Sequence, residues 1–553
     1  MTATEPPASP KLPALDRRSL LKAGLLGSGL LAAPLSASQP GRGFTHGVAS
    51  GEPGPDRVLL WTRFQADQDT PLEFEVSDSV DFTRKIAGGS IAARAENDWC
   101  CKTLAEGLEP AQSYYFRFIA PDGSISDIGR TRTLPEGPAD RFRIAVFSCA
   151  NIGFGWFNAY AHAAADGNFD CVLHLGDYFY EYAPGTYPST DETVSGRSVW
   201  PSHELVALAD YRERYAAYRQ DPDLRRLHQL FPMIAVWDDH ESANDSWEGG
   251  AENHQPDSEG EWSVRKAAAM KAYREWMPVS DEPWAEYEVG DLATLYRLET
   301  RLTARAKQFS LGDVLRGGSS PEEAKAALIA FRDGDYRDPA RELLGSAQQG
   351  WLAEGFSRSK AAGKTWQVLV QQVLMGNLVS SPSLAAVLPK DAPDYIRQRV
   401  LAGAMAGAEG VPFSMDAWDG YPAARRRVFE AALSADANLI SLAGDTHNAW
   451  AFDLDLEGTP VGVEFGGQSV TSPGFEGYLP QVPPDVLARD AVATNAQLQW
   501  MDSSRRGYMA VELTPGSATS EYRFLGSVRE KGAGVVATKR MTTLAGSRKL
   551  DMG

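Results

Sequence analysis

Side chains of the kinds that bind metal ions follow several short apolar runs of this sequence, where those runs end. Cys149 stands in FSCAN, Asp177 and Tyr180 in HLGDYFYE, and Asp445 with His447 in LAGDTH. A further motif, WDDHESAN, adds Asp238, Asp239, His240 and Asn244. Each motif alone is weak, because an Asp after a strand is more often a helix cap and a buried Cys is usually core packing. Together they offer thiolate, phenolate, carboxylate and imidazole donors to a metal ion.

The apolar runs that precede these residues have the length of buried β-strands. FRIAVF, CVLHL, PMIAVW, WQVLV and NLISLA are continuous rather than alternating, which is typical of a sheet covered on both faces. Helical stretches such as 205–218 and 263–276 lie between them. Since loops beyond the ends of such strands gather at one edge of the sheet, we expect the donors to lie together. So many carboxylates would repel one another unless cations lay between them.

The chain divides into regions of different pattern. Residues 44–133 contain short strands such as VLLWTRF and SYYFRFIA, separated by GEPGPD and PDG turns, which predicts an all-β sandwich. We therefore predict a layered fold of the α+β or α/β type. An Ig-like β-sandwich at 41–134 precedes an α/β sandwich at 139–530, and 531–553 is a C-terminal tail. The charged stretch 303–344 is predicted to be a helical insertion.

The first residues have the pattern of an export signal. Arg17 and Arg18 stand before an apolar run at 23–35, and small residues follow near Ala37. The pair resembles the twin-arginine signal, so residues 1–38 are predicted to be a signal peptide read by the twin-arginine export machinery. The run is too short to cross a bilayer, and no stable membrane anchor is expected. We therefore predict that the protein is periplasmic or secreted. The alternative is an ordinary secretory signal with two chance arginines.

Composition narrows the class of protein. The 553 residues suggest two or three domains, and 73 acidic against 54 basic residues give a net charge of −19. Such a charge repels nucleic acid, so no nucleic-acid binding is expected. Four cysteines, two of them adjacent, are too few for a disulfide framework.

The motifs taken together resemble those of the PhoD-type alkaline phosphatases, a branch of the calcineurin-like metallophosphoesterases. FTHGVASGEPGPDRVLLWTR resembles the opening of the family's N-terminal domain, and MDAWDGYPAARRRVF and RGYMAVELT also fit. The resemblance covers almost the whole chain after the signal, and it implies a metallophosphoesterase-like α/β sandwich that hydrolyses phosphate esters. One departure is Glu299 in LETR, where the family more often has Asp, which leaves the role of Arg301 open.

The resemblance also implies how two kinds of ion are bound. One Fe(III) ion would take anionic and imidazole ligands: Cys149, Asp177, Tyr180 and His447. One or more Ca²⁺ ions would take oxygen ligands: Asp177 as a bridge, Asp239 and Asp445, with Asp238 or Asn244 completing the shell or holding a further ion.

Asp177 and His240 are the predicted catalytic residues. Two adjacent ions can hold a phosphate and lower the pKa of a bound water, so Asp177 would act through both ions. His240 would steady the phosphate or protonate the leaving oxygen. The alternative is that His240 only donates hydrogen bonds to the ligands.

The predicted function is that of an exported phosphoesterase that hydrolyses phosphate monoesters and some diesters for phosphate scavenging. One alternative is a phosphodiesterase, or a phospholipase D-like enzyme, acting on lipid or polymer diesters. Which of these applies depends on whether a lid blocks the second substituent, and residues 378–412 are the candidate lid. A noncatalytic exported binding protein is a further alternative.

Overall fold

The computed structural model describes residues 42–316, 320–384, 394–412 and 414–552. The predicted signal peptide, with Arg17 and Arg18, lies outside the described residues, and so does the middle of the candidate lid, residues 385–393. Residues 43–553 form one structural unit, and the description below concerns this unit.

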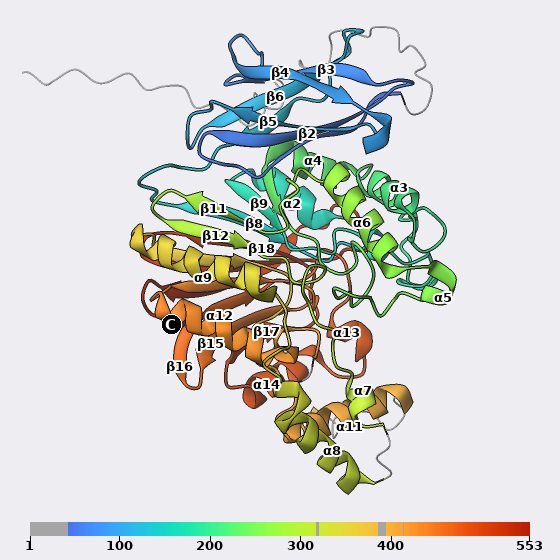
Figure 1. The fold of residues 1–553 in the computed structure, drawn as a ribbon, viewed down its shortest axis with the longest axis vertical. Coiled ribbons are helices and arrows are strands. Elements are labelled where there is room, and N and C mark those ends of the chain that lie inside the picture. Colours follow the sequence, from blue (N-terminus) through green and yellow to red (C-terminus); the bar gives the residue numbers. More distant parts are fainter. Residues whose placement is uncertain (1–41, 317–319, 385–393, 413, 553) are drawn as a thin grey trace, which may run out of the picture. The chain divides into compact units, whose positions relative to one another are not determined.

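Ten strands form the larger of two central sheets (Figure 1), in the order β21-β20-β19-β18-β8-β9-β10-β1-β2-β5. Their bounds are β1 Gly43–Gly51, β2 Arg57–Gln65, β5 Cys100–Glu106, β8 Phe142–Phe147, β9 Cys171–His174, β10 Pro232–Ala235, β18 Gly507–Leu513, β19 Ser517–Leu525, β20 Val535–Leu544 and β21 Leu550–Asp551. At the centre of the sheet, β8, β9, β10 and β1 pair in parallel. Their carboxyl ends therefore lie at the same edge.

Seven strands form the second central sheet, in the order β11-β12-β13-β14-β16-β15-β17. Their bounds are β11 Ala285–Val289, β12 Ala293–Arg297, β13 Trp366–Val370, β14 Leu439–Ala443, β15 Ala449–Leu456, β16 Thr459–Gly466 and β17 Leu498–Asp502. The strands β12, β13, β14 and β16 are parallel. This sheet, too, gathers strand ends at one edge.

The two sheets pack face to face around one apolar layer. Ile144 and Val146 of β8 share a buried cluster with Val368 of β13 and Ile440 of β14. The intervening residues point away from this layer, because successive side chains of a strand lie on opposite faces. Both faces of the central strands are thus buried, which explains their continuous apolar runs.

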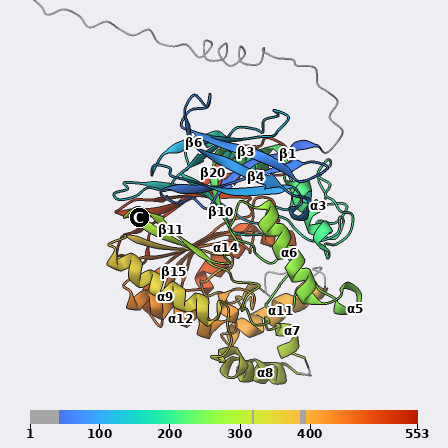
Figure 2. The same cartoon turned by 45° about the horizontal axis from the view of Figure 1, so that its top comes forward.

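Helices cover the outer faces of both sheets. The clusters on those faces combine α2, α3, α4 and α6 with the first sheet, and α9 and α12 with the second. Figures 1 and 2 both place α9 and α12 side by side. The helices span α2 Asn158–Asp166, α3 Leu208–Tyr218, α4 Pro222–Leu230, α5 Pro256–Glu259, α6 Trp262–Trp276, α9 Gly345–Ala361, α12 Pro422–Ser434, α13 Phe475–Tyr478 and α14 Pro484–Thr494. The expected layered α/β sandwich is confirmed.

The N-terminal sandwich forms as expected, but it is not a separate sheet system. The four-stranded sheet β4-β3-β6-β7 packs on β1 and β2 through a cluster that includes Leu60, Phe74 and Phe116. Its strands are β3 Thr70–Ser77, β4 Lys85–Ala93, β6 Ser113–Ile119 and β7 Gly129–Arg132. Because β1 pairs with β10, the other half of the sandwich continues directly into the larger central sheet.

The expectation that residues 531–553 form a tail is wrong. Strand β20 lies in this segment and pairs with β19 over most of its length, and β21 pairs with β20. Met541 is buried in the layer between the sheets. One face of β20 is exposed, so its apolar residues do not form a continuous run. Such a strand is harder to recognise in the sequence than the central strands, which are mostly apolar.

The segment 303–344 contains α7 (Leu311–Val314) and α8 (Pro321–Asp333), as the predicted helical insertion requires. These helices pack with α11 (Asp394–Ala408), which lies in the candidate lid, around a small cluster of their own. Figures 1 and 2 show the three helices together beyond the ends of the second sheet.

Candidate metal centre

The expected donors lie on loops that follow four strands. Cys149 follows β8, Asp177 follows β9, Asp238 follows β10 and Asp445 follows β14 of the second sheet. Backbone hydrogen bonds join the first two loops: the N–H of Cys149 donates to Gly176 O (3.1 Å), and that of Ala150 to Asp177 O (2.8 Å). Parallel strands in two face-to-face sheets thus bring distant parts of the sequence to one edge.

The backbone at these strand ends is unusual. Four proposed ligands have a positive φ: Cys149 (59°), Asp177 (51°), Asp445 (63°) and His447 (63°). Left-handed conformations of residues other than glycine cost free energy, and they persist where the surroundings impose them, often at functional sites. The loops also approach closely, since a Cβ on Gly176 would lie 2.4 Å from the Cβ of Asp238.

The donors form three overlapping groups, in each of which the possible ligand atoms lie within 4.8 Å of one another. The groups are Cys149, Asp177 and His447; Asp177, Asp239 and His240; and Asp238, Asp239 and Asp445. The first mixes sulfur, oxygen and nitrogen donors, and the last contains oxygen donors alone. Asp177 belongs to the first two groups, which is the position expected of a bridging carboxylate.

Tyr180 lies beside the first group. Its hydroxyl is 3.2 Å from Asp177 Oδ2 and 3.1 Å from His447 Nε2, and it accepts a hydrogen bond from Ser472 Oγ (2.7 Å). Since Ser472 also donates to the carbonyl of Cys149, one serine touches both the tyrosine and the loop of the cysteine. The structure therefore brings Tyr180 to the cysteine, aspartate and histidine with which it was grouped.

His447 is oriented as a metal ligand would be. Its Nδ1 is 2.8 Å from the carbonyl oxygen of Pro473, which can only accept a hydrogen bond, so Nδ1 carries the proton. Burial lowers the pKa of His447 to about 3, so the ring is neutral and Nε2 carries a lone pair, which points to the hydroxyl of Tyr180 at 3.1 Å. Ligating histidines commonly donate their other N–H in this way.

Buried oxygens without hydrogen-bond donors indicate that the cluster is built for cations. Within the described part of the chain, Asp177 Oδ1 and Asp238 Oδ2 have no hydrogen-bond partner, although both residues are buried. Burial raises the pKa of Asp177 and of the Cys149 thiol well above their ordinary ranges. A cation would supply the missing partner and favour the anionic forms, so the donor set fits bound metal ions.

Arg301, whose role the sequence left open, lies among the carboxylates. Its Nε donates to Asp238 Oδ1 (2.5 Å), and its Nη2 lies 3.1 Å from Asp445 Oδ1. Its Nη1 donates to both oxygens of Asp416 (2.7 Å each). Glu299 sets this position, since its carboxylate accepts from the backbone N–H of Arg301 (2.8 Å). Sequence reasoning missed Asp416, although it stands in the family motif MDAWDGYP.

The guanidinium changes the acidity of its neighbours. Burial disfavours the charged form of Asp239, but the positive charges of Arg301 and His240 lower its pKa below the ordinary range. Burial raises the pKa of Asp445 to about 7, even though Arg301 opposes the shift. The single arginine therefore neutralises only part of the negative charge in the cluster.

His240 forms an ion pair that the sequence did not predict. Its Nδ1 is 2.6 Å from Glu181 Oε2, and Glu181 is fully buried. Burial lowers the pKa of His240, but Asp239 and Glu181 outweigh that effect and raise it well above 6.5. His240 is therefore held as a hydrogen-bond donor beside the proposed ligands Asp177 and Asp239. Glu181 directly follows Tyr180 in the sequence, and that adjacency was the available signal.

Asn244 makes different contacts from those expected of a ligand. Its side-chain amide donates to Glu252 Oε2 (3.2 Å), and its backbone N–H donates to Glu181 Oε1 (2.8 Å). These contacts do not support Asn244 as a ligand, and its role stays a prediction.

Comparisons with known proteins agree with this geometry. The family model of the PhoD-like phosphatases matches residues 144–522, and the model of the family's N-terminal domain matches residues 30–135. The chain therefore belongs to the PhoD-like phosphatase family, a family of phosphoric ester hydrolases. Membership of this family implies phosphoesterase activity. The candidate metal-binding groups described above agree with that activity.

Particular relatives can be named. The chain is 33% identical over 530 residues to alkaline phosphatase D of Bacillus subtilis, a match that covers 91% of this chain and 81% of that protein. A solved structure of PhoD superposes with a TM-score of 0.74 at 29% identity and covers 93% of this chain and 92% of the other. These likenesses extend over the sandwich and both central sheets.

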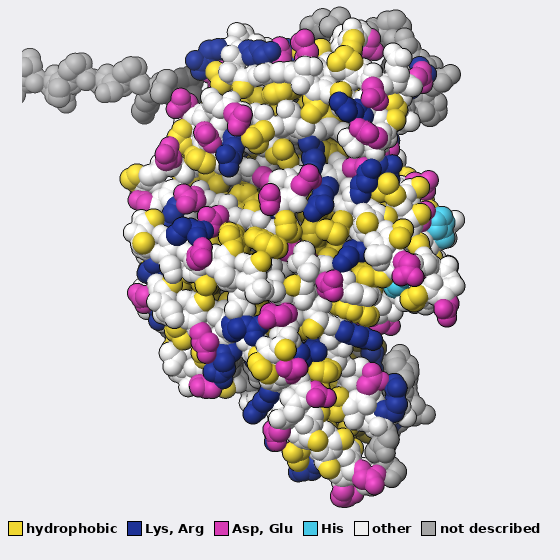
Figure 3. Space-filling model, in the orientation of Figure 1, with side chains coloured by type: hydrophobic (Ala, Val, Ile, Leu, Met, Phe, Trp, Pro, Cys, Tyr) yellow, Lys and Arg dark blue, Asp and Glu magenta, His cyan; other side chains and the backbone are white. Residues whose placement is uncertain are grey.

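Two surface properties complete the description. On the face drawn in Figure 3, basic and acidic side chains are interspersed, so this face provides no field of one sign to attract a polyanion. Among the helices that the structure describes, none combines the length and the apolar character needed to cross a membrane.

Proposed function

We propose that this protein hydrolyses phosphate monoesters with one Fe(III) ion and at least one Ca²⁺ ion bound in the cluster. The observation that carries the proposal is the division of donors into a mixed sulfur, oxygen and nitrogen group and an all-oxygen group. A third group connects them, because it shares Asp177 with the first and Asp239 with the second. Oxidised iron favours anionic phenolate and thiolate, whereas calcium favours oxygen ligands alone.

The residues of the chain have distinct roles in this proposal. Cys149, Tyr180 and His447 would hold the iron, and Asp239 and Asp445 would hold the calcium. Asp177 would serve both sites, and its Oδ2 lies 3.2 Å from the hydroxyl of Tyr180. When bound, the ions would neutralise the phosphate and activate a water for in-line attack.

His240 and Arg301 supply positive charge from the protein. Glu181 orients His240 through a 2.6 Å contact, and in this proposal His240 donates a proton to the leaving oxygen. Arg301 holds Asp238, Asp416 and Asp445 in place, so its first role is to position carboxylates.

Hydrolysis assays test the reaction. Purified protein is given a monoester and a diester of the same alcohol, with added calcium, with chelator, and with chelator followed by calcium. We expect the monoester to be hydrolysed faster, and chelation to abolish turnover in a way that calcium partly restores. A diester hydrolysed at least as fast as the monoester would favour the phosphodiesterase alternative, and metal-independent turnover would contradict the proposed centre.

Absorption spectra test the identity of the first ion. Phenolate and thiolate ligands of Fe(III) give charge-transfer absorption, so we expect a coloured protein and an altered visible band in Tyr180→Phe. Elemental analysis should find one iron per chain. An active, colourless and iron-free protein would show that another metal occupies the site of Cys149 and Tyr180.

We also propose that the protein is exported by the twin-arginine route and releases phosphate from extracytoplasmic esters. Arg17 and Arg18 before the apolar run support this proposal. Replacing both by Lys keeps the positive charge that a general secretory signal needs but removes the guanidinium pair. We expect the double variant to stay inside the cell, and normal export would contradict the twin-arginine route.

A further inference from the structure

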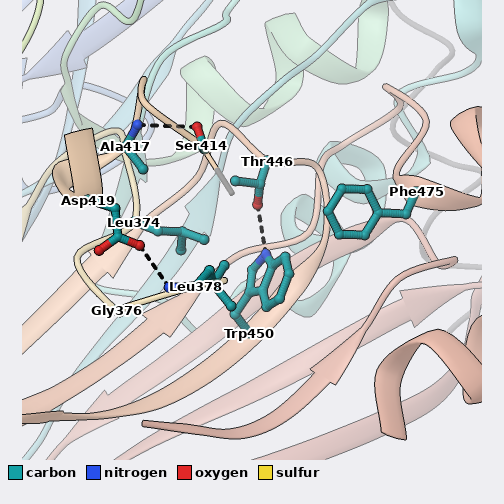
Figure 4. A pocket seen from close by; sticks show the side chains of 9 residues that line it. All are labelled: Leu374, Gly376, Leu378, Ser414, Ala417, Asp419, Thr446, Trp450 and Phe475. Atoms are coloured by element: carbon teal, nitrogen blue, oxygen red, sulfur yellow. Dashed lines mark hydrogen bonds between the residues drawn. The ribbon is translucent and has the colours of Figure 1, made fainter. Parts of the chain in front are cut away.

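An apolar pocket of about 140 Å³ lies next to the candidate metal centre. Figure 4 shows its wall, in which Leu374, Leu378, Trp450 and Phe475 surround one space. These residues come from the loop after β13, from β15 and from α13. None of them has a role in the chemistry proposed above.

Two other wall residues connect the pocket to the metal centre. Thr446 stands between the proposed ligands Asp445 and His447, and consecutive Cα atoms are only about 3.8 Å apart. Ser414 lies two residues before Asp416, and its hydroxyl accepts the N–H of Asp416 (3.2 Å). The wall of the pocket is therefore built in part from the same loops that carry Asp445, His447 and Asp416.

The polar groups in the wall are already engaged. The hydroxyl of Thr446 accepts from Trp450 Nε1 (2.7 Å), which is drawn as a dashed line in Figure 4. The carboxylate of Asp419 accepts from the N–H of Leu378 (2.7 Å) and from Asn377 Nδ2 (2.8 Å), and it pairs with Arg425. The wall thus presents mainly carbon to an occupant. A sugar or a charged group would leave its polar atoms unpaired there.

Size and shape indicate which apolar group fits. An enclosed apolar cavity of about 150 Å³ is known to accept benzene, so this pocket has room for one six-membered ring. The rings of Trp450 and Phe475 meet edge to face, with centroids 5.9 Å apart and planes at 85°. Aromatic walls in this geometry favour contact with a further ring.

We propose that this pocket binds the alcohol portion of the phosphate ester and selects esters whose alcohol carries a ring-sized apolar group. The inference rests on the proposed function, because it assumes that the phosphate binds at the metal centre. It adds a substrate class that the metal ligands do not define.

Benzyl phosphate and ethyl phosphate form the test pair, because both release a simple primary alcohol and differ mainly in the ring. We expect the wild-type holoenzyme to show a higher kcat/KM for benzyl phosphate. In Phe475→Ala the benzyl-to-ethyl ratio should fall about tenfold, because the edge-to-face wall is lost, and in Leu378→Ala about threefold. Leu401→Ala, in which an exposed side chain of α11 is shortened, is the matched control and should keep the wild-type ratio.

Binding provides a second measurement. Benzylphosphonate and ethylphosphonate cannot be hydrolysed, and calorimetry on the metal-loaded protein gives both dissociation constants. We expect the benzyl compound to bind more tightly, and to lose that advantage in Phe475→Ala and Leu378→Ala. Using both variants keeps the test open if one of them fails to fold.

The outcomes separate this inference from the proposed function. If ethyl phosphate is hydrolysed with metal but the benzyl-to-ethyl ratio is the same in wild type and pocket variants, the pocket proposal is overturned and the phosphatase proposal stands. If neither ester is hydrolysed by the metal-loaded protein, the proposed function is overturned, and this inference with it.

Discussion

Buried carboxylates occur in two regions of this molecule, and they differ in how completely their oxygens are hydrogen-bonded. Glu464 lies in β16 of the second sheet and is fully buried. Its oxygens accept from the N–H groups of Met375 and Gly376 and from Ser441 Oγ, at 2.8 to 3.0 Å. Asp177 and Asp238 are buried to nearly the same extent, yet each keeps one oxygen without a donor among the described residues.

The difference in hydrogen bonding separates structural carboxylates from candidate metal ligands. Burial raises the pKa of both Glu464 and Asp177, so burial alone does not separate them. Hydrogen-bond saturation does, because a structural carboxylate is stabilised by the chain, whereas a metal ligand must keep lone pairs for its ion.

The sharpest way to break this comparison is Asp177→Asn. An amide cannot supply the charge that two ion sites share, so we expect turnover to fall on the order of a hundredfold or more. The metal-free variant should melt no lower than the metal-free wild type, because a buried like charge is removed. Steady-state assays and thermal melts of both forms measure the two effects.

If Asp177→Asn instead retained more than about a tenth of wild-type turnover, Asp177 would not be the bridge. A large drop in the melting temperature of the metal-free form would place it with Glu464 among the structural acids.

The counterpart in the second sheet is Glu464→Gln. This variant should change how the free energy of unfolding depends on pH. Burial raises the pKa of Glu464 from 4.5 to about 7, so between these values the folded state holds a proton that the unfolded state has released. The stabilisation is complete below pH 4.5 and is lost as the pH rises through about 7. Its size is on the order of 3 kcal/mol.

Glutamine does not titrate, so the stability advantage of the wild type over Glu464→Gln should shrink across this interval. Urea unfolding from pH 4.5 to 8.5 measures it. Parallel stability curves for the two proteins would show that Glu464 does not titrate there, and turnover of the variant should stay near that of the wild type.

A smaller effect is expected for Arg301→Lys. The planar guanidinium reaches Asp238, Asp416 and Asp445 through three different nitrogens, and a single ammonium cannot do so. We expect kcat/KM to fall about tenfold because the carboxylates lose their positions. Full activity in the lysine variant would mean that only the positive charge matters. Far-ultraviolet circular dichroism serves as the folding control.

The smallest effect is expected for Ser441→Ala, which removes one of the donors to Glu464 (2.8 Å). The loss of a buried hydrogen bond costs about 1 kcal/mol of unfolding free energy. Chemical denaturation should detect this cost, while metal content and turnover stay unchanged. Loss of metal in Ser441→Ala would contradict the assignment of Glu464 as a purely structural carboxylate.

Much of the fold followed from local pattern. The runs that became β8, β9, β10, β13 and β14 are continuous and apolar, and both of their faces are buried. The pattern did not reveal β20, which has one exposed face and few buried apolar residues. It also could not show that β1 pairs with β10, because a pairing between residues so distant in the chain depends on how the sandwich docks.

The metal centre was anticipated in part. Cys149, Asp177, Tyr180 and His447 were found because they stand in recognisable motifs directly after strands. Asp416 stands in the family motif MDAWDGYP but directly follows no strand, and its contact with Arg301 places it among the other carboxylates. Glu181 directly follows Tyr180, but adjacency in the sequence does not show that its side chain is buried beside His240.

By itself, the sequence determined the order of strands and helices and the types of donor at the strand ends, because these depend on local periodicity and on side-chain chemistry. Only the tertiary structure decided which donors lie together, which of the described oxygens are left without hydrogen bonds, and that Arg301 lies among four carboxylates. It also placed the apolar pocket beside Thr446. These features depend on distances between loops from two sheets, and such distances are fixed only when the sheets pack.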